Sequence, residues 1–217
     1  MFTGIIKDLG TVKDIKRKQG AAVLTVDSEI ISNDISIGDS VAINGVCLTV
    51  TEVNKKVISF DLSKETLDVT DLGELTVNDC INLEPSLRPM DYMGGHFVSG
   101  HVEEVGIILE KRRDDEDYVF KISAGPQIID LTVQRGSMTV DGISLTVTRV
   151  NEGSFEVVII PHTLKMTTLG SKGSGDKVNL ESDLIARYIK RIMESQNVEV
   201  AGGGSDRLDE LIKDAFE

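Results

Sequence analysis

The strongest constraint on this chain is that it contains one unit twice. Asn44–Thr51 (NGVCLTVT) recurs as Asp141–Thr148 (DGISLTVT), an offset of 97 residues, and Thr3–Ile6 matches Ser99–Val102 at an offset of 96. Further segments recur at 97: Glu65–Leu67 as His162–Leu164, and Asn82–Glu84 as Asn179–Glu181. A unit of this size is ordinary for an independent hydrophobic core, so the sequence predicts two similar domains.

Each copy alternates apolar and polar residues with a period of two. Val46, Leu48 and Val50 alternate with Cys47 and Thr49, and the second copy repeats the pattern. This pattern predicts a strand with one buried face. Asn-Gly and Asp-Gly before these strands favour type I′ turns, so each repeat is expected to form a small antiparallel barrel. Short helices are expected at 63–67 and 125–129.

The outward positions of these strands are the first candidates for chemistry. Cys47 and Thr49 share one outward face, and Ser144 and Thr146 share the equivalent face in the second copy. Such residues most often form a solvated or edge face. The alternative is a nucleophilic or hydrogen-bonding role, above all for Cys47.

The segment Gly94–His101 (GGHFVSGH) holds two of the three histidines. On an extended strand, their separation of five residues places His96 and His101 on opposite faces, so no shared metal is expected. We interpret His96 as a buried or turn-capping imidazole. His101 stands at the start of a duplicated strand where the first copy has Ile5, which suggests that the two barrels have diverged in task.

The composition excludes several classes of partner. The chain has 36 Asp plus Glu against 23 Lys plus Arg, a formal charge of −13, which disfavours binding to nucleic acids and anionic membranes. No apolar run reaches the roughly 18 residues of a membrane span. Cys47 and Cys80 make no disulfide framework or zinc spacing, so we expect a cytoplasmic protein.

The pattern changes after the second repeat. Ser182-Asp183 precedes an apolar stripe at helical spacing, formed by Leu184, Ile185, Tyr188, Ile189, Ile192 and Met193. The stripe predicts a helix that packs on its own domain or on another subunit, and the spacing alone leaves both open. Gly202–Ser205 then breaks the chain before a short polar helix, an arrangement typical of a mobile tail.

Several of these motifs together resemble riboflavin synthases of the alpha-chain type. They are Met1–Ile6, Asn44–Thr51, Gly94–His101, Asp141–Val147 and Ile160–Thr163, and the resemblance extends to about Arg191. It implies an all-β fold of two six-stranded Greek-key barrels with a C-terminal helix that gathers three subunits. The domains would be 1–96 and 97–182 for the two lumazine-binding barrels, 183–196 for the trimerisation helix, and 197–217 for the linker and polar helix.

The same resemblance implies an activity. Riboflavin synthases convert two molecules of 6,7-dimethyl-8-ribityllumazine into riboflavin and 5-amino-6-(D-ribitylamino)uracil by moving a four-carbon unit, without a metal or redox cofactor. In that family the active site forms between barrels of neighbouring subunits. The resemblance therefore implies a homotrimer; it leaves an association with lumazine synthase open.

The site residues are carried over from the family position by position. The first-barrel pocket would comprise Gly4, Ile5, Ile6, Cys47, Leu48, Thr49, Asp61, Leu62, Ser63, Lys64, Glu65, Thr66, Gly100, His101 and Val102. The second would comprise Arg135, Ser144, Leu145, Thr146, Val158, Ile159, Ile160, Pro161, His162 and Thr163. His101 is expected in proton transfer, Ser144 and Thr146 in hydrogen bonding or proton relay, and Cys47 as a nucleophile or a polar contact.

Two rival hypotheses remain from the sequence. The first is a non-enzymatic protein that binds a lumazine or flavin in the same double barrel, as the antenna relatives of this family do. The second is an adaptor without a ligand, against which the matching Cys, His, Ser and Thr positions argue.

Overall fold

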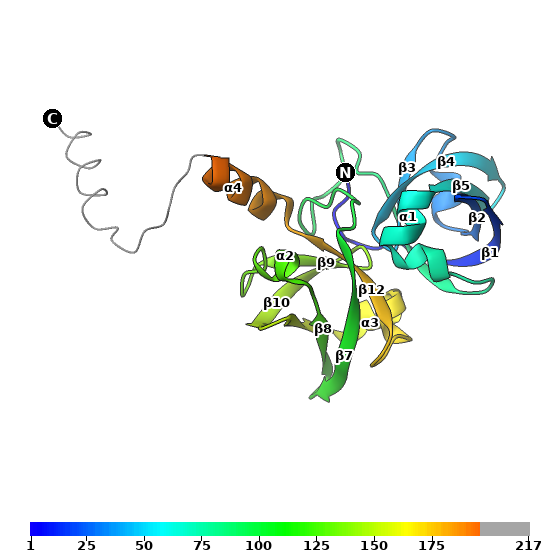
Figure 1. The fold of residues 1–217 in the computed structure, drawn as a ribbon. Coiled ribbons are helices and arrows are strands. Elements are labelled where there is room, and N and C mark those ends of the chain that lie inside the picture. The colour runs from blue at the N-terminus through cyan, green and yellow to red at the C-terminus, as the bar shows by residue number, and fades with distance from the viewer. Residues whose placement is uncertain (196–217) are drawn as a thin grey trace, which may run out of the picture. The chain divides into compact units, whose positions relative to one another are not determined.

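A computed structural model describes residues 1–195 of the chain, which form two closed β-barrels and, after them in sequence, a helix (Figure 1). The predicted fold class is therefore confirmed. The first barrel, drawn in blue to cyan, closes in the order β1-β2-β5-β4-β3-β6, with all neighbours antiparallel. Its strands are β1 (Asp8–Lys18), β2 (Ala21–Asp27), β3 (Ser40–Ile43), β4 (Val46–Asn54), β5 (Val57–Ser63) and β6 (Cys80–Pro85). Because β2 returns to lie beside β5 rather than β3, the connection is a Greek key.

The second barrel repeats this topology in the order β7-β8-β11-β10-β9-β12. Its strands are β7 (Glu104–Asp114), β8 (Asp117–Ser123), β9 (Ser137–Val140), β10 (Ile143–Asn151), β11 (Ser154–Ile159) and β12 (Lys177–Ser182). The irregularities repeat as well, since β4 shifts register between Val50 and Glu52, and β10 shifts between Val147 and Arg149. Bulges at equivalent places show that the duplication preserved the bends of the strands.

Each barrel encloses its own hydrophobic core. In β4, Val46, Leu48 and Val50 point inward and are buried, while Cys47 is half-buried and Thr49 exposed. The expected alternation is therefore confirmed. The centre of the first core includes Phe60 and that of the second Phe120 and Phe155, all at 0% exposure. Burying each such ring contributes about 2–3 kcal/mol.

The two predicted type I′ turns are present. Asn44 and Gly45 have φ of 44° and 82°, and Asp141 and Gly142 have φ of 47° and 79°. Positive φ at both central residues is the mark of this turn, which suits the right-handed twist of the flanking strands.

Short helices fill the connections between strands. The two expected helices are confirmed as α1 (Lys64–Val69), where Ser63 accepts a hydrogen bond from the Thr66 N–H, and α2 (Pro126–Ile129). The others are α3 (Pro161–Met166) and the 3-10 turns η1 (Ile31–Asn33), η2 (Asp71–Glu74) and η3 (Thr168–Gly170).

The helix α4 (Leu184–Ser195) lies within the segment 183–196 that the sequence assigned to a helix. The apolar stripe lies along it, with Ile185, Tyr188, Ile189 and Ile192 at helical spacing. The predicted linker and polar helix at 197–217 lie outside the described residues. No helix among residues 1–195 has the length and apolar character to cross a bilayer.

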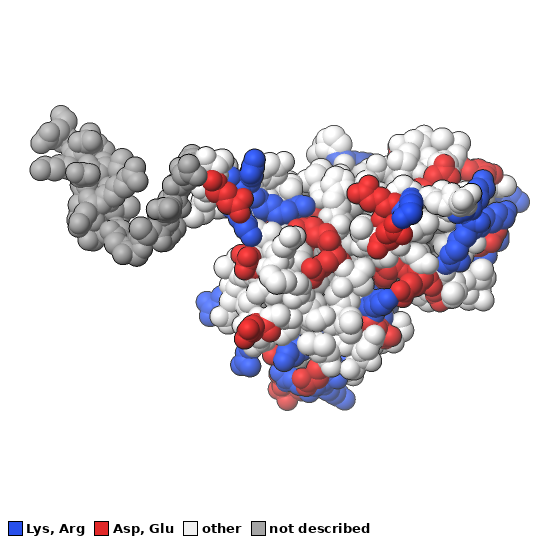
Figure 2. All heavy atoms as spheres, in the orientation of Figure 1, with Lys and Arg blue, Asp and Glu red and all other residues white. Residues whose placement is uncertain are grey.

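Charge is distributed over the barrels in patches of both signs. On the face drawn in Figure 2, acidic and basic side chains are interspersed. The charged segment Lys111–Asp117 forms the tip of the β7–β8 hairpin, since the two strands pair up to Asp114 and Asp117.

Candidate functional site

The two hairpins β3–β4 and β9–β10 carry the candidate residues at equivalent positions. Cys47 is the second residue of β4 and Ser144 the second residue of β10, and each is half-buried. The turns at the ends of these hairpins meet, because a Cβ added to Gly45 would lie 2.7 Å from the Gly142 nitrogen and the reverse also holds. Only glycine permits this approach of two backbones.

The segment before each barrel crosses to the hairpin of the other barrel. The Ser144 N–H donates to the Gly4 carbonyl at 2.8 Å, and the Cys47 N–H donates to the Gly100 carbonyl at 2.9 Å. Gly4 and Gly100 adopt φ of 77° and 81°, which turns the chain toward the other barrel. Each hairpin is therefore completed by the opposite repeat.

Two buried glutamates hold these crossing segments. Glu84 accepts from the backbone N–H groups of Thr3 and Gly4 at 2.7 and 3.0 Å, and Glu181 accepts equivalently from Ser99 and Gly100 at 2.8 and 3.0 Å. Burial raises the pKa of the Glu84 carboxyl, while these hydrogen bonds oppose the shift. In both repeats, a buried glutamate therefore holds the crossing segment by accepting two backbone hydrogen bonds.

This crossing corrects the sequence-based grouping of two segments. Gly4, Ile5 and Ile6 were assigned to the first pocket, but they lie against the second barrel, where Ile6 packs on the second core. Gly100 and Val102 do lie against the first barrel, as expected. Comparing the two repeats in the sequence identifies which residues are equivalent. It does not reveal that each crossing segment lies against the barrel of the opposite repeat.

His101 also differs from expectation in its local structure. It does not start a strand, because β7 begins only at Glu104. The positive φ of Gly100 ends the extended geometry just before it. His101 is exposed, and its backbone N–H lies 3.4 Å from the Ser99 hydroxyl.

The second-barrel site contains a cavity of about 190 Å³. Six of the predicted residues line it: Gly4, Ile5, Ile6, Ser144, His162 and Thr163. Ile143, Met166 and Thr167 complete the lining, and none of these was predicted. The helix α3 supplies His162, Thr163 and Met166, so the wall of the cavity is formed by one hairpin, one crossing segment and one short helix.

The other predicted second-site residues are outside this lining. Leu145 and Ile159 point into the barrel core. Thr146, Val158, Ile160 and Pro161 are exposed. Arg135 is exposed on the loop before β9, with a φ of 68° at the position equivalent to Gly38.

The predicted first-site residues lie on β4, β5 and α1. Leu48 and Leu62 belong to the core, whereas Thr49, Asp61, Ser63, Lys64 and Glu65 are exposed and Thr66 is half-buried. Phe2 is fully buried and packs with Ala42, Val98 and Cys47. Cys47 therefore packs against a small apolar cluster beside the first barrel.

His96 is the functional candidate that the sequence underestimated. Its Nδ1 lies 2.7 Å from the Ser144 hydroxyl and its Nε2 lies 3.2 Å from the Thr139 hydroxyl. The imidazole is half-buried rather than buried, and desolvation lowers its pKa despite the nearby Asp183 carboxylate. Neutral His96 can therefore exchange a proton with Ser144 at the edge of the cavity.

The described residues contain no group of three or more histidine, cysteine, aspartate or glutamate side chains arranged to hold a metal ion. The polar side chains on the two hairpins and at the cavity include hydroxyls, the Cys47 thiol and imidazoles. These groups can accept, donate and relay protons and can position a planar heteroaromatic ligand.

Comparison with known proteins places this geometry in a family. The model of the lumazine-binding domain matches twice, over residues 3–86 and 99–183. Riboflavin synthase of Actinobacillus pleuropneumoniae is 42% identical over 193 residues, covering 89% of this chain and 90% of that protein. Those of Bacillus subtilis (strain 168) and Schizosaccharomyces pombe are 38% and 35% identical, covering 91% and 90% of this chain and 92% and 95% of those proteins. The chain belongs to the riboflavin synthase family.

Membership of the riboflavin synthase family confirms the resemblance drawn from the sequence. Solved structures agree on the fold, since LumP complexed with 6,7-dimethyl-8-(1'-D-ribityl) lumazine matches with a TM-score of 0.76 at 21% identity, covering 84% of this chain and 99% of that one. LumP complexed with riboflavin matches with a TM-score of 0.78 at 22% identity, with the same coverage. The domain boundaries inferred from the sequence stay a prediction.

Proposed function

We propose that this chain converts two molecules of 6,7-dimethyl-8-ribityllumazine into riboflavin and 5-amino-6-(D-ribitylamino)uracil. It is then an enzyme, a transferase, in which one lumazine gives up four carbons and the other gains them. The observation that carries the proposal is the pair of equivalent hairpins, since a reaction between two copies of one substrate needs two related sites. Aligning two bound rings removes most of the entropic cost of a bimolecular step.

The roles of the side chains follow from where protons must move. The C7 methyl group of the lumazine is acidic because its carbanion delocalises into the pteridine ring, so a moderate base suffices. We assign proton transfer to His101 and to the pair of His96 and Ser144, whose separation of 2.7 Å suits a relay. Thr146 is proposed as a hydrogen-bond donor, and Cys47 as a nucleophile toward C7 or a polar contact.

The assembly is also part of the proposal. We expect a homotrimer gathered by the apolar stripe of α4, with the first barrel of one subunit facing the second barrel of a neighbour. Sedimentation of Ile189→Asp should reveal smaller species with little activity, because a carboxylate in a packed apolar stripe is not solvated. Glu194→Gln, which alters the same helix without touching the stripe, should sediment and turn over like the wild type. A cytoplasmic location and an association with lumazine synthase stay predictions.

One assay tests the activity directly. Purified metal-free protein is incubated with 6,7-dimethyl-8-ribityllumazine, and riboflavin formation and lumazine consumption are followed together. The proposal expects two lumazines consumed for each riboflavin formed. Tight binding without conversion would favour a non-enzymatic lumazine-binding protein, and neither binding nor conversion would favour an adaptor.

A further inference from the structure

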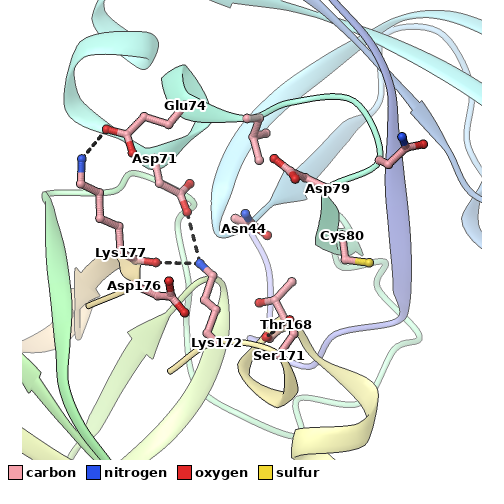
Figure 3. Close-up of a pocket in the computed structure, with 12 residues that line it drawn as sticks. Asn44, Asp71, Glu74, Asp79, Cys80, Thr168, Ser171, Lys172, Asp176 and Lys177 are labelled. Carbon is pink, nitrogen blue, oxygen red and sulfur yellow. Dashed lines mark hydrogen bonds and ion pairs between the residues drawn. The ribbon is translucent and has the colours of Figure 1, made fainter. Parts of the chain in front are cut away.

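A half-buried lysine, Lys172, lies between the carboxylates of Asp71 and Asp141 where the barrels meet, and Figure 3 shows it beside Asp71. The Lys172 ammonium is 2.5 Å from the Asp141 carboxylate and 3.4 Å from that of Asp71, and it also donates to the Lys177 carbonyl at 2.7 Å. The Lys172 side chain is 19% exposed and that of Asp141 0%. Lys172 and Asp71 line a cavity of about 450 Å³.

The Asp141 carboxylate is shielded from solvent, so the Lys172 ammonium stabilises its charge in place of water. Burial raises the pKa of Asp141, and the Lys172 charge opposes that shift and favours the ionised form. The other carboxylate oxygen accepts the Asn179 backbone N–H at 2.8 Å, which fastens the β9–β10 turn to β12. Removing the ammonium would leave a buried charge without its partner.

The first repeat achieves the same turn without charge. Asn44 stands where the second repeat has Asp141, and its side-chain oxygen accepts the Asn82 backbone N–H at 2.8 Å. Leu75, a core residue, stands where the second repeat has Lys172. Each of these turns also receives one residue from the opposite repeat. Asp71 bonds to Asn179 beside the Asp141 turn, and its equivalent Thr168 bonds to Asn82 beside the Asn44 turn. The fold therefore accepts neutral residues around the turn of the first hairpin, whereas Asp71, Asp141 and Lys172 form a charged set around the turn of the second.

That hairpin is the one that holds the imidazole. Thr139 on β9 and Ser144 on β10 are cross-strand partners, and both bond to the His96 ring, at 3.2 and 2.7 Å. The equivalent partners in the first barrel are Ala42 and Cys47, which provide no second hydroxyl. The charged set and the histidine bridge thus occur together on the second hairpin.

We infer that Lys172 is a positioning residue for the second site, where it holds the β9–β10 turn through Asp141 so that Ser144 and Thr139 stay within hydrogen-bonding distance of His96. The inference concerns the geometry of the His96 bridge, and its consequence for turnover rests on the proposed function. Among the described residues, the bonding partners of the Lys172 ammonium are Asp71, Asp141 and the Lys177 carbonyl, and these do not line the cavity beside Ser144.

Histidine NMR tests the geometry without any assay of activity. The chain has three histidines, so a spectrum of the full-length protein labelled with ¹⁵N-histidine contains few ring signals, and His96→Gln assigns those of His96. In Lys172→Met, we expect the ring nitrogen shifts of His96 to move toward those of a histidine free in solution. The signals of His101 and His162 should stay in place.

Steady-state kinetics then test the consequence of the Lys172 contact for turnover. In Lys172→Met we expect kcat to fall by about tenfold or more with KM nearly unchanged, because a displaced relay affects the reaction more than ligand binding. Lys177→Met is the matched control, since Lys177 lines the same cavity and pairs across the barrels with Glu74 but does not touch Asp141. It should keep the wild-type kcat and His96 signals. Unchanged His96 signals and kcat in Lys172→Met would overturn the inference.

A triple variant tests whether Lys172 positions the second hairpin through its contact with Asp141. Asp71→Thr, Asp141→Asn and Lys172→Leu together place at this turn the same neutral residue types that Asn44, Leu75 and Thr168 provide at the turn of the first hairpin, where the chain already folds with them. We expect this variant to restore the His96 signals and most of the turnover, even if Lys172→Met fails to fold. A folded triple variant with a displaced His96 would refute the role of Asp141. A wild-type protein that forms no riboflavin would refute the proposed function, while the NMR result would still decide the positioning.

Discussion

The hairpin that carries Cys47 and the hairpin that carries Ser144 have the same backbone and different chemistry. Both end in type I′ turns, both accept a crossing segment from the opposite repeat, and both contain a bulge at the same place. The first presents a thiol beside the apolar side chains of Phe2 and Ala42. The second presents a hydroxyl bonded to an imidazole.

The difference teaches that duplication preserved the scaffold and left the side chains free to diverge. If the two lumazines have unequal tasks, as donor and acceptor of four carbons, equal pockets would be poorly suited to both. A transition state is stabilised only by interactions that fit its own charge distribution. The contrast between the two hairpins can therefore be probed by changing matched residues in each.

The largest effect is expected where the two hairpins are alike. Gly142→Ala and Gly45→Ala should each lower the free energy of unfolding by about 4 kcal/mol, because the new Cβ would meet a backbone nitrogen of the other turn at 2.7 Å and also occupy a positive φ. Denaturant unfolding measures this. Gly20→Ala is the control, since Gly20 has a φ of 74° and open space around it; about 1 kcal/mol is expected there. Clearly unequal losses at Gly45 and Gly142 would show that the junction is not symmetric in energy.

The next effect separates the hairpins by their chemistry. Ser144→Ala should lower kcat/KM by about 100-fold, because it removes the hydroxyl that bonds to His96. Cys47→Ser should lower turnover by about tenfold and change the free energy of unfolding by less than about 1 kcal/mol, since the side chain is half-buried and the change is nearly isosteric. Steady-state kinetics and denaturant unfolding of each variant measure these two effects. Wild-type turnover in Cys47→Ser would remove the thiol from the site.

The sequence predicted the scaffold better than the site. Periodicity and the recurring Asn-Gly and Asp-Gly turns are local signals, so they predicted the strands, the repeats and the outward face of Cys47 and Ser144. The exchange of Gly4–Ile6 and Gly100–Val102 between barrels depends on two positive φ values and on Glu84 and Glu181, which no periodic pattern reports. His96 was underestimated for a similar reason, because its partners Ser144 and Thr139 lie over 40 residues away in the chain.

A smaller effect tests the exchange of segments. Glu84→Gln should cost about 2 kcal/mol of stability, because the amide can turn only one oxygen toward the donors and its NH₂ group then faces an N–H. Glu181→Gln should cost a similar amount, since Glu181 accepts the equivalent bonds from Ser99 and Gly100. Urea unfolding compares the two. Glu52→Gln, at an exposed position of β4, serves as the control and should stay within about 0.5 kcal/mol of the wild type. If Glu84→Gln leaves the free energy of unfolding unchanged, other contacts hold the crossing segment.

The smallest effect is a pH dependence confined to the second hairpin. Burial lowers the pKa of His96 below its usual 6.5, so the folded protein binds this proton less readily than the unfolded chain. The stability that follows from neutral His96 is complete above pH 6.5 and declines as the pH falls from there through the lowered pKa. kcat/KM should decline over the acidic range for the same reason, because protonated His96 can no longer accept a proton from Ser144. His96→Gln should lose this part of both profiles, whereas Cys47→Ser should keep it, since the first hairpin pairs Cys47 with Ala42. An acidic limb of the same size in His96→Gln would assign the titration to another group and leave the imidazole a structural bridge between Ser144 and Thr139.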